Sequence, residues 1–271
     1  MQIPYVHPFD WDGILQFLRL RAVPQLELVS ENKYQRISRS GVVTVQNDLT
    51  SKALIVDAPG DVAHSIKRLF ATDVDVRQMR RHLSRDPVLA PVVNRHSGMR
   101  VPGAWDPFEI IIRAIVGQQI TVKAATTILG RIVALYGERV GEPPLQYLFP
   151  TPERLASADF HGIGVPQKRC AAMRFISEKI HQQVLKLDGN MPLPEFVAQL
   201  TAFPGIGSWT AHYIAMRGFG YADAFPPGDV AVERGFSKLM GRKINFIQLQ
   251  RRAESWSPWR SYAVMHIWRS L

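Results

Sequence analysis

The chain is organised around one turn, Phe203-Pro204-Gly205-Ile206-Gly207-Ser208-Trp209-Thr210-Ala211, which lies between two helical patterns. Gly205 and Gly207 are residues that a chain uses where its backbone turns tightly and approaches another group closely. The second helix opens directly after the turn, so its first amides have no partner within the helix. Those amides and the positive end of the helix dipole suit a phosphate. A plain connection between two helices is the alternative interpretation.

A carboxylate follows this turn at Asp229, behind the stiff segment Phe225-Pro226-Pro227-Gly228. An aspartate before a helical pattern is a good N-cap, worth about 1 kcal/mol. The helix terminus also favours the anionic form of such a carboxylate. A fixed anion is what cleavage of a glycosidic bond needs, because departure of the leaving group puts positive charge on the sugar ring. Asp229 is therefore a candidate cap and a candidate catalytic group.

The composition indicates a basic protein of 271 residues, with 33 Lys and Arg against 23 Asp and Glu and a net charge of +10. Such a balance favours nucleic acid or an anionic membrane surface, although a basic enzyme without either partner has the same balance. The single cysteine, Cys170, excludes an intrachain disulfide framework, a cysteine-based zinc finger and a four-cysteine iron–sulfur cluster. The chain shows no secretory signal and no apolar run of roughly 18–20 residues, so we expect a cytoplasmic protein without membrane contact.

Residues 1–90 have the pattern of an α+β domain. Asp10 precedes an apolar helical spacing that extends to Arg21, and Asp61 precedes a second helix that extends to about Phe70. Four short segments between them are mostly β-branched or alternating, which predicts an antiparallel meander. These segments are 26–29, 34–37, 42–45 and 53–56.

From residue 91 onward the chain is predicted to be helical. Apolar spacing and start signals predict the longer helices, which are 107–116, 121–136, 194–202, 208–217 and 230–240. A short helix is expected from Thr151-Pro152-Glu153, another helix after Arg169, and a last helix at Pro258 with Ser257 as its cap. Two adjacent glutamines, Gln118 and Gln119, interrupt the first pair of helices. A polar turn is the simplest interpretation of them.

A second G-I-G arrangement lies in His161-Gly162-Ile163-Gly164-Val165-Pro166-Gln167-Lys168-Arg169, again before a helix. The pair of turns indicates a degenerate repeat of helix–hairpin–helix units. Lys168 and Arg169 would suit a phosphate there, whereas a basic helix start in solvent is the alternative.

Several further motifs carry a family resemblance. The hairpin extends as Leu200-x-x-Phe203-Pro204-Gly205-Ile206-Gly207-x-Trp209-Thr210-Ala211, and a Pro-rich loop then ends in Asp229. Further segments carry the same resemblance, and they are Ala114-Ile115-Val116-Gly117-Gln118, Phe149-Pro150-Thr151-Pro152, Pro258-Trp259-Arg260-Ser261-Tyr262-Ala263 and His266-Ile267-Trp268. From residue 100 onward the chain resembles the helix–hairpin–helix, Gly/Pro-rich, Asp superfamily of DNA glycosylases. It is most similar to the alkylation-repair group of the 3-methyladenine DNA glycosylase II type.

The resemblance implies a fold and a division of the chain. The fold is α+β: an antiparallel-sheet domain with helices over 1–90, then a two-lobed all-α region over 91–271. One lobe, about 108–221, would carry the hairpin. Residues 91–107 and 222–271 would form the other lobe, with the active-site cleft between the two.

The resemblance also implies roles for single residues. Asp229 would be the catalytic carboxylate, and Trp209, Tyr213 and Trp268 would line a pocket for the flipped base. Gln119 would be the wedge that fills the gap in the duplex, with Ile120 as the neighbouring alternative because this group can carry an apolar wedge. The remaining DNA contacts would come from Gly205, Ile206, Gly207, Ser208, Thr210, Lys168 and Arg169. Hairpin carbonyls would offer a site for a monovalent cation, and no other metal or cofactor is expected.

The implied activity is monofunctional. Members with a lyase step place a nucleophilic lysine where this chain has Trp209, so we expect water to accept the sugar. N3- or N7-alkylated purines carry positive charge and would be attracted by electron-rich aromatic faces. The expected partner is double-stranded DNA with damaged bases, bound by a monomer, and 3-methyladenine, 7-methylguanine, hypoxanthine and ethenoadenine all stay open as substrates. The alternatives are an oxidised-purine glycosylase and a non-catalytic helix–hairpin–helix DNA-binding protein.

Overall fold

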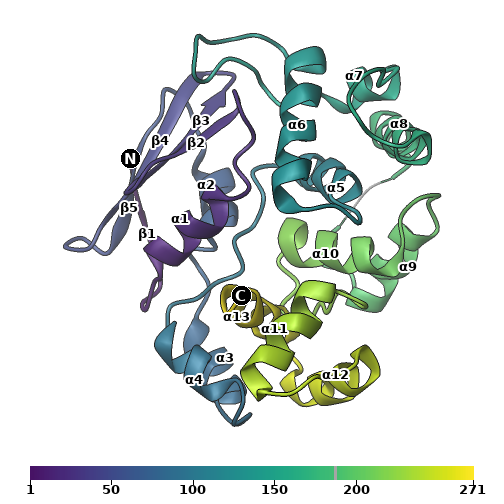
Figure 1. Ribbon diagram of the computed structural model, residues 1–271. Helices are drawn as coiled ribbons and strands as arrows, with labels where there is room; N and C mark the ends of the chain where they lie inside the picture. The colour runs from purple at the N-terminus through teal and green to yellow at the C-terminus, as the bar shows by residue number, and fades with distance from the viewer. Residues whose placement is uncertain (186–187) are drawn as a thin grey trace.

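The computed structural model describes residues 1–185 and 188–271. Figure 1 shows a sheet domain on one side of the molecule and helices arranged in an upper and a lower group on the other. Within the described ranges, no helix is both long enough and apolar enough to cross a membrane.

The N-terminal domain contains one antiparallel sheet with strand order β1-β5-β4-β3-β2. The four predicted strands are confirmed, and the sequence analysis missed β1, which is only three residues long and pairs with β5. The register places Tyr34 opposite Val45 and Val45 opposite Val56, so buried side chains line up across neighbouring strands. The strand bounds are β1 Gln2–Pro4, β2 Glu27–Val29, β3 Lys33–Ser38, β4 Gly41–Asp48 and β5 Ala53–Asp57.

Two amphipathic helices, α1 (Trp11–Arg19) and α2 (Ala63–Phe70), pack against this sheet. The Asp10 side chain accepts a hydrogen bond from the Gly13 amide at 3.0 Å, which confirms the predicted cap. Apolar residues of both helices and of the sheet form a core of their own. Because this core closes without the later helices, the domain has an independent apolar centre.

The rest of the described chain is helical, with α3 Val76–Leu83, α4 Ala90–Arg95, α5 Pro107–Val116, α6 Val122–Tyr136, α7 Pro152–Ala156, α8 Gln167–His181, α9 Leu193–Thr201, α10 Ser208–Phe219, α11 Val230–Met240, α12 Phe246–Ala253, the 3₁₀ turn η1 Glu254–Trp256 and α13 Arg260–Arg269. Figure 1 shows α5 to α10 above and α11 to α13 below, with α3 and α4 beside α13. The fold class is confirmed. The domain boundary at residue 90 and the lobe limits stay predictions.

The last helix starts at a different residue from the one predicted. Helix α13 begins at Arg260, two residues later than predicted, and Ser257 does not cap it. The Ser257 hydroxyl instead donates to the Asp223 carboxylate at 2.9 Å, and Arg260 donates to the same carboxylate at 2.7 and 2.8 Å. The Ser257 hydroxyl therefore binds the distant Asp223 carboxylate and not the start of the helix.

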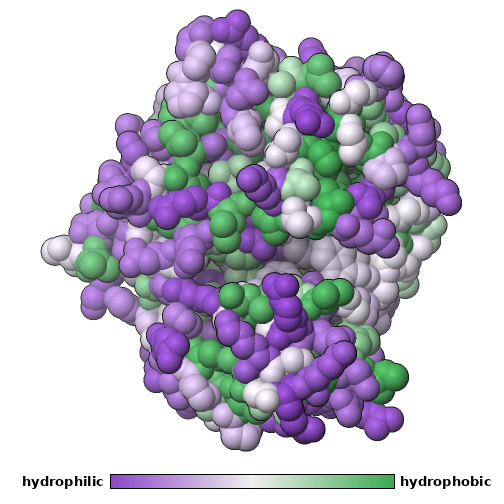
Figure 2. Space-filling model, in the orientation of Figure 1, coloured by the Kyte–Doolittle hydropathy of each residue, from purple (hydrophilic) through white to green (hydrophobic). Residues whose placement is uncertain are grey.

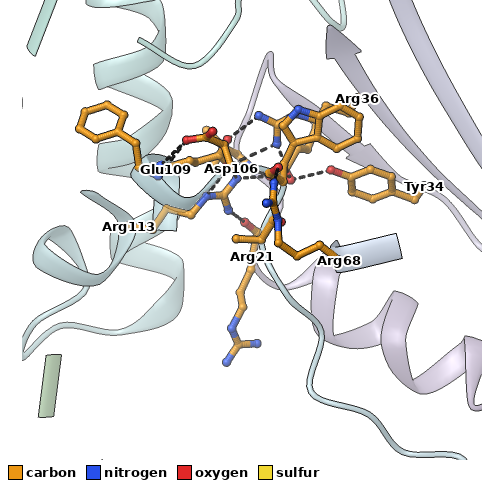
Figure 3. A network of polar contacts seen from close by, with 12 residues as sticks. Arg21, Tyr34, Arg36, Arg68, Asp106, Glu109 and Arg113 are labelled. Atoms are coloured by element: carbon orange, nitrogen blue, oxygen red, sulfur yellow. Dashed lines mark hydrogen bonds and ion pairs between the residues drawn. The ribbon is translucent and has the colours of Figure 1, made fainter. Parts of the chain in front are cut away.

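A buried network of ion pairs joins the sheet domain to α5, as Figure 3 shows. Arg36 on β3 contacts Glu27 at 3.3 Å and Glu109 on α5 at 2.5 Å. Arg113, one turn further along α5, contacts the same two carboxylates at 2.6 and 2.5 Å. Burial raises the pKa of Glu27, but the charges of Arg113 and Arg36 outweigh it and lower that pKa to about 2. The network fixes α5, the helix that leads into the Gln118-Gln119 turn, against the N-terminal domain.

Candidate active site and DNA interface

Asp229 is the N-cap of α11. Its Oδ1 accepts a hydrogen bond from the Val232 amide at 2.8 Å, and the residue is only 7% exposed. The preceding Gly228 has a φ of +71°, which lets the chain turn directly into the helix. The cap interpretation is thus correct, and the same geometry fixes the carboxylate at the positive end of a helix dipole.

Two indole rings also hold this carboxylate. The Nε1 of Trp209, on α10, donates to Oδ2 at 2.9 Å, and the Nε1 of Trp268, on α13, donates to Oδ1 at 3.3 Å. Three donors from three helices therefore converge on one side chain. Because both oxygens accept hydrogen bonds, the position and orientation of the carboxylate are fixed.

The three predicted pocket aromatics form one cluster. Trp209 and Tyr213 stack with centroids 5.2 Å apart and planes 13° apart, as expected for positions i and i+4 on one helix. Trp268 lies tilted at 47° to Tyr213, with centroids 6.3 Å apart. The cluster presents electron-rich ring faces beside a fixed anion, a combination that attracts a flat cation.

Behind the aromatics lies a charged group that the sequence analysis missed. The Nη1 of Arg217 donates to the Tyr213 hydroxyl at 3.1 Å, and its Nη2 donates to the Gly103 carbonyl at 3.0 Å. Burial lowers the pKa of Arg217 to about 10. Burial would raise the pKa of the Tyr213 phenol, but the charges of Arg217, Arg21 and Arg113 outweigh it and lower that pKa. Arg217 continues the helical stripe of Trp209 and Tyr213, a spacing that could have indicated it.

The hairpin has one packed and one open glycine. Gly205 has a φ of +84°, and a Cβ there would lie 2.6 Å from the Cβ of Ala172 on α8. Gly207 is the N-cap of α10 without a side-chain cap, and a Cβ there would meet no atom within 4 Å. Gly205 therefore allows the hairpin to pack closely on α8, whereas open space lies beside Gly207, and the first amides of α10 have no side-chain cap, as an anion-binding helix start requires.

Family models match almost the whole chain. The model described as AlkA N-terminal domain matches residues 1–106, and the model described as HhH-GPD superfamily base excision DNA repair protein matches residues 112–261. The chain belongs to the HhH-GPD superfamily.

Its similarity to individual members is high. DNA-3-methyladenine glycosylase 2 of Escherichia coli is 36% identical, with 96% of this chain and 94% of that protein aligned. A Mycobacterium tuberculosis protein described as "Probable bifunctional transcriptional activator/DNA repair enzyme AlkA" is 34% identical, over all of this chain and 57% of that protein. The 3-methyladenine DNA-glycosylase of Archaeoglobus fulgidus has the same fold, with a TM-score of 0.85, 22% identity and coverage of 99% of this chain and 97% of that one.

The turn before α6 supplies a further link within this HhH-GPD site. The Nε2 of Gln118 donates to the Gly205 carbonyl at 2.9 Å and to the Thr210 hydroxyl at 2.9 Å, so the turn is tied to the hairpin. Gln119 is exposed at the tip of the turn with a φ of +55°, whereas Ile120 packs against the core. The protruding residue is therefore Gln119. This role of Gln118 was not predicted from the sequence.

The other predicted DNA contacts lie in two places. Ser208 is exposed at the start of α10, while Ile206 and Thr210 are buried, which limits any DNA contact of these two residues to their backbone. Lys168 is exposed in the first turn of α8, and the neighbouring Arg169 donates to the Val116 carbonyl at 3.5 Å. The α8 terminus thus approaches the end of α5.

A cleft of about 1620 Å³ connects the hairpin, the Gln119 turn and Asp229. Figure 2 shows this face of the HhH-GPD protein hollowed across its middle. The N-terminal domain also lines the cleft, through Arg21 and Glu27 among others, so three parts of the chain enclose it. In the described part of the chain, no group of three His, Cys, Asp or Glu residues could hold a metal ion.

Proposed function

We propose that this alkylbase DNA glycosylase cleaves the N-glycosidic bond by hydrolysis alone, with Asp229 as its catalytic carboxylate. The observation that carries the proposal is the convergence of the Trp209 indole, the Trp268 indole and the Val232 amide on Asp229. A buried anion held in this way lies beside the aromatic cluster that would receive a flipped base.

The proposed reaction begins when a damaged base leaves the stack of double-stranded DNA and enters the cleft. Stacking on Trp209, Tyr213 or Trp268 favours an alkylated purine, because its positive charge faces a ring quadrupole. The C1′–N bond then breaks with its electron pair going to the base, and Asp229 stabilises the positive charge on the sugar. Water adds to C1′ and loses a proton, which leaves an abasic site and the free base.

The identity of residue 209, directly after the hairpin, supports a mechanism without a lyase step. A lyase would need an amine nucleophile at C1′, and the corresponding position is Trp209, which already donates to Asp229. None of the described residues that line the cleft is a lysine. We therefore propose that the DNA strand stays intact.

The proposed DNA grip has three parts. The free amides from Gly207 onward would bind a phosphate next to the lesion, and Gln119 would fill the gap left by the flipped base. Lys168 and Arg169 would bind the backbone further along the duplex. The carbonyls of the hairpin suit a monovalent cation, although the Gly205 carbonyl already accepts from Gln118. We propose that a single copy of the chain, in the cytoplasm, suffices for this arrangement.

The test is Asp229→Asn on duplex DNA that contains 7-methylguanine or 3-methyladenine. Asparagine is an equally good N-cap, so the fold should survive, which the melting temperature checks. We expect base release to be abolished while binding to the duplex is retained. Retained release by a folded variant would refute the role of Asp229. Strand cleavage by the unmodified protein, before any alkaline treatment, would refute the hydrolytic mechanism.

A further inference from the structure

Most of the net positive charge of the chain lies outside the cleft. Two segments, 76–95 and 241–253, together contain nine Lys and Arg residues and a single acidic residue, Asp86. These 33 residues therefore have a net charge of +8, against +10 for the whole chain. In the described part of the chain, the cleft lining includes no residue of either segment. The charge excess is thus separate from the groups that would receive a flipped base.

The two segments form one surface. Arg252 on α12 donates to the Asp86 carboxylate at 2.7 and 2.9 Å, and a ring nitrogen of His82, on α3, lies 2.9 Å from the Ser255 carbonyl oxygen. Helix α3 also packs against α4. Figure 1 shows α3, α4 and α12 along the lower end of the molecule, with α11 and α13 between them and the upper helices. These contacts hold the basic side chains of both segments together on one rigid support.

Most of these cations face solvent. Asp86 is buried and already accepts from Arg252, so it does not neutralise the others. In the described part of the chain, only Arg77 among the exposed members has a carboxylate partner, Asp75 at 2.8 Å. Like charges held together repel one another, and a bound polyanion removes this repulsion. The exposed members, here called the basic surface, are Arg77, Arg80, Arg81, Arg85, Arg95, Arg242, Lys243 and Arg251.

The chemistry of the basic surface favours duplex DNA over an acidic protein or a membrane. The exposed side chains of α3 are all polar or charged, whereas a protein interface or a membrane-bound helix presents apolar side chains to its partner. Ile247 on α12 is an exposed apolar neighbour. Seven of the eight cations are arginines, whose planar fork binds two phosphate oxygens at once. Arg77 and Arg81 lie one turn apart on the same side of α3, and Arg85 follows the end of the helix.

We propose that the basic surface is a second DNA-binding site, which holds duplex DNA by its phosphates outside the cleft. Contacts with phosphates carry no information about sequence or damage, so this site retains the protein on undamaged DNA without entering the cleavage step. Because the cleft and the basic surface share no residue, one copy of the chain can hold two duplex segments at once. The inference goes beyond the proposed function and does not depend on the role of Asp229.

The experiment fills the cleft first and then offers a second duplex. A short duplex with an abasic-site analogue is bound at saturation, and an undamaged duplex with a different fluorophore is titrated by anisotropy at several salt concentrations. The unmodified protein should bind both duplexes together. The triple variant Arg81→Gln, Arg85→Gln, Arg251→Gln should bind the second duplex more weakly. The slope of log affinity against log salt concentration should become shallower by about 2–3, as expected for the loss of three phosphate contacts.

The matched control removes three exposed cations elsewhere, in the variant Arg39→Gln, Lys52→Gln, Arg139→Gln. None of these three residues lines the cleft or belongs to the basic surface. The control should bind the second duplex as the unmodified protein does. Both variants should release 7-methylguanine at the unmodified rate in a single turnover at saturating enzyme, which checks that the cleft is intact.

Displacement of the first duplex by the second, without a complex that contains both, would overturn the proposal. Equal weakening in the two triple variants would overturn it too, because net charge alone would then explain the binding. Tighter binding of polyglutamate than of a duplex of equal charge would assign the surface to an acidic protein instead. Each of these results leaves the proposed function untouched, because that depends on base release by folded Asp229→Asn and on strand cleavage.

Discussion

Replacement of Trp209 by phenylalanine separates two roles of that residue. The variant keeps an aromatic ring that can stack on Tyr213 but removes the indole N–H that donates to Asp229 at 2.9 Å. A hydrogen bond to a charged group is worth about 1.5–3 kcal/mol. Because Asp229 is only 7% exposed, bulk water replaces the lost donor poorly. At 1.36 kcal/mol per factor of ten, base release should slow by roughly 10- to 150-fold.

The assay is single-turnover release of a cationic and of a neutral base at saturating enzyme, so that weaker binding does not enter the rate. If the N–H group positions Asp229, both bases should slow by a similar factor. Trp259→Phe is the control, because Trp259 lies outside the cleft lining and packs on Tyr262. A loss confined to the cationic base would assign the effect to the ring face, and a change below about threefold would refute the positioning role.

Two further predictions concern stability and DNA binding. Gly205→Ala should lower the free energy of unfolding in urea by about 1–3 kcal/mol, because of the φ of +84° and the close contact with α8. Gly207→Ala should fold normally and bind duplex DNA more weakly. Equal stability of the two variants would contradict this prediction. His266 is buried, neither of its ring nitrogens has a hydrogen-bond partner among the residues that the structure describes, and burial lowers its pKa to about 3. Its folded pKa lies below the unfolded value of 6.5, so its stabilising contribution is complete above pH 6.5 and falls by about 1.4 kcal/mol per unit as the pH drops toward 3. Urea unfolding at pH 7.5 and 4.5 should show a smaller pH effect in His266→Phe, and an unchanged effect would refute the assignment.

Local signals predicted much of the fold. Asp10 and Asp229 cap their helices as predicted, because a cap depends on residues within one turn. The predicted helix starts at Asp106, Thr121 and Thr151 are also capped by those side chains. The meander was predictable from alternation, whereas β1 is too short to alternate. Helix α3 was not predicted, because it has only eight residues, five of them polar or charged, and its apolar side chains pack against distant segments.

The site was predictable only where a motif carried it. Local chemistry made the hairpin and Asp229 candidates, the resemblance to a family added the three aromatics, and the roles of all of them stay predictions. Gln118 was missed because its partners lie 87 and 92 residues away in the sequence, whereas the helical spacing of Arg217 from Tyr213 could have indicated that residue. Nothing around Arg21 in the sequence indicates that it lines one cleft with Tyr213, since that arrangement exists only after the sheet domain has docked on α5.

The buried network of Arg36, Arg113, Glu27 and Glu109 has a consequence for how this sequence can change over time. The charges of the two arginines and the two glutamates cancel. Substitution of one member leaves an opposite charge buried without a partner, which lowers the free energy of unfolding by about 3–5 kcal/mol. Tolerated replacements must therefore neutralise both signs together. Because Arg36 and Glu109 lie 73 residues apart, on either side of the domain junction, exchange of one domain between relatives would succeed only if the recipient carried the complementary charges.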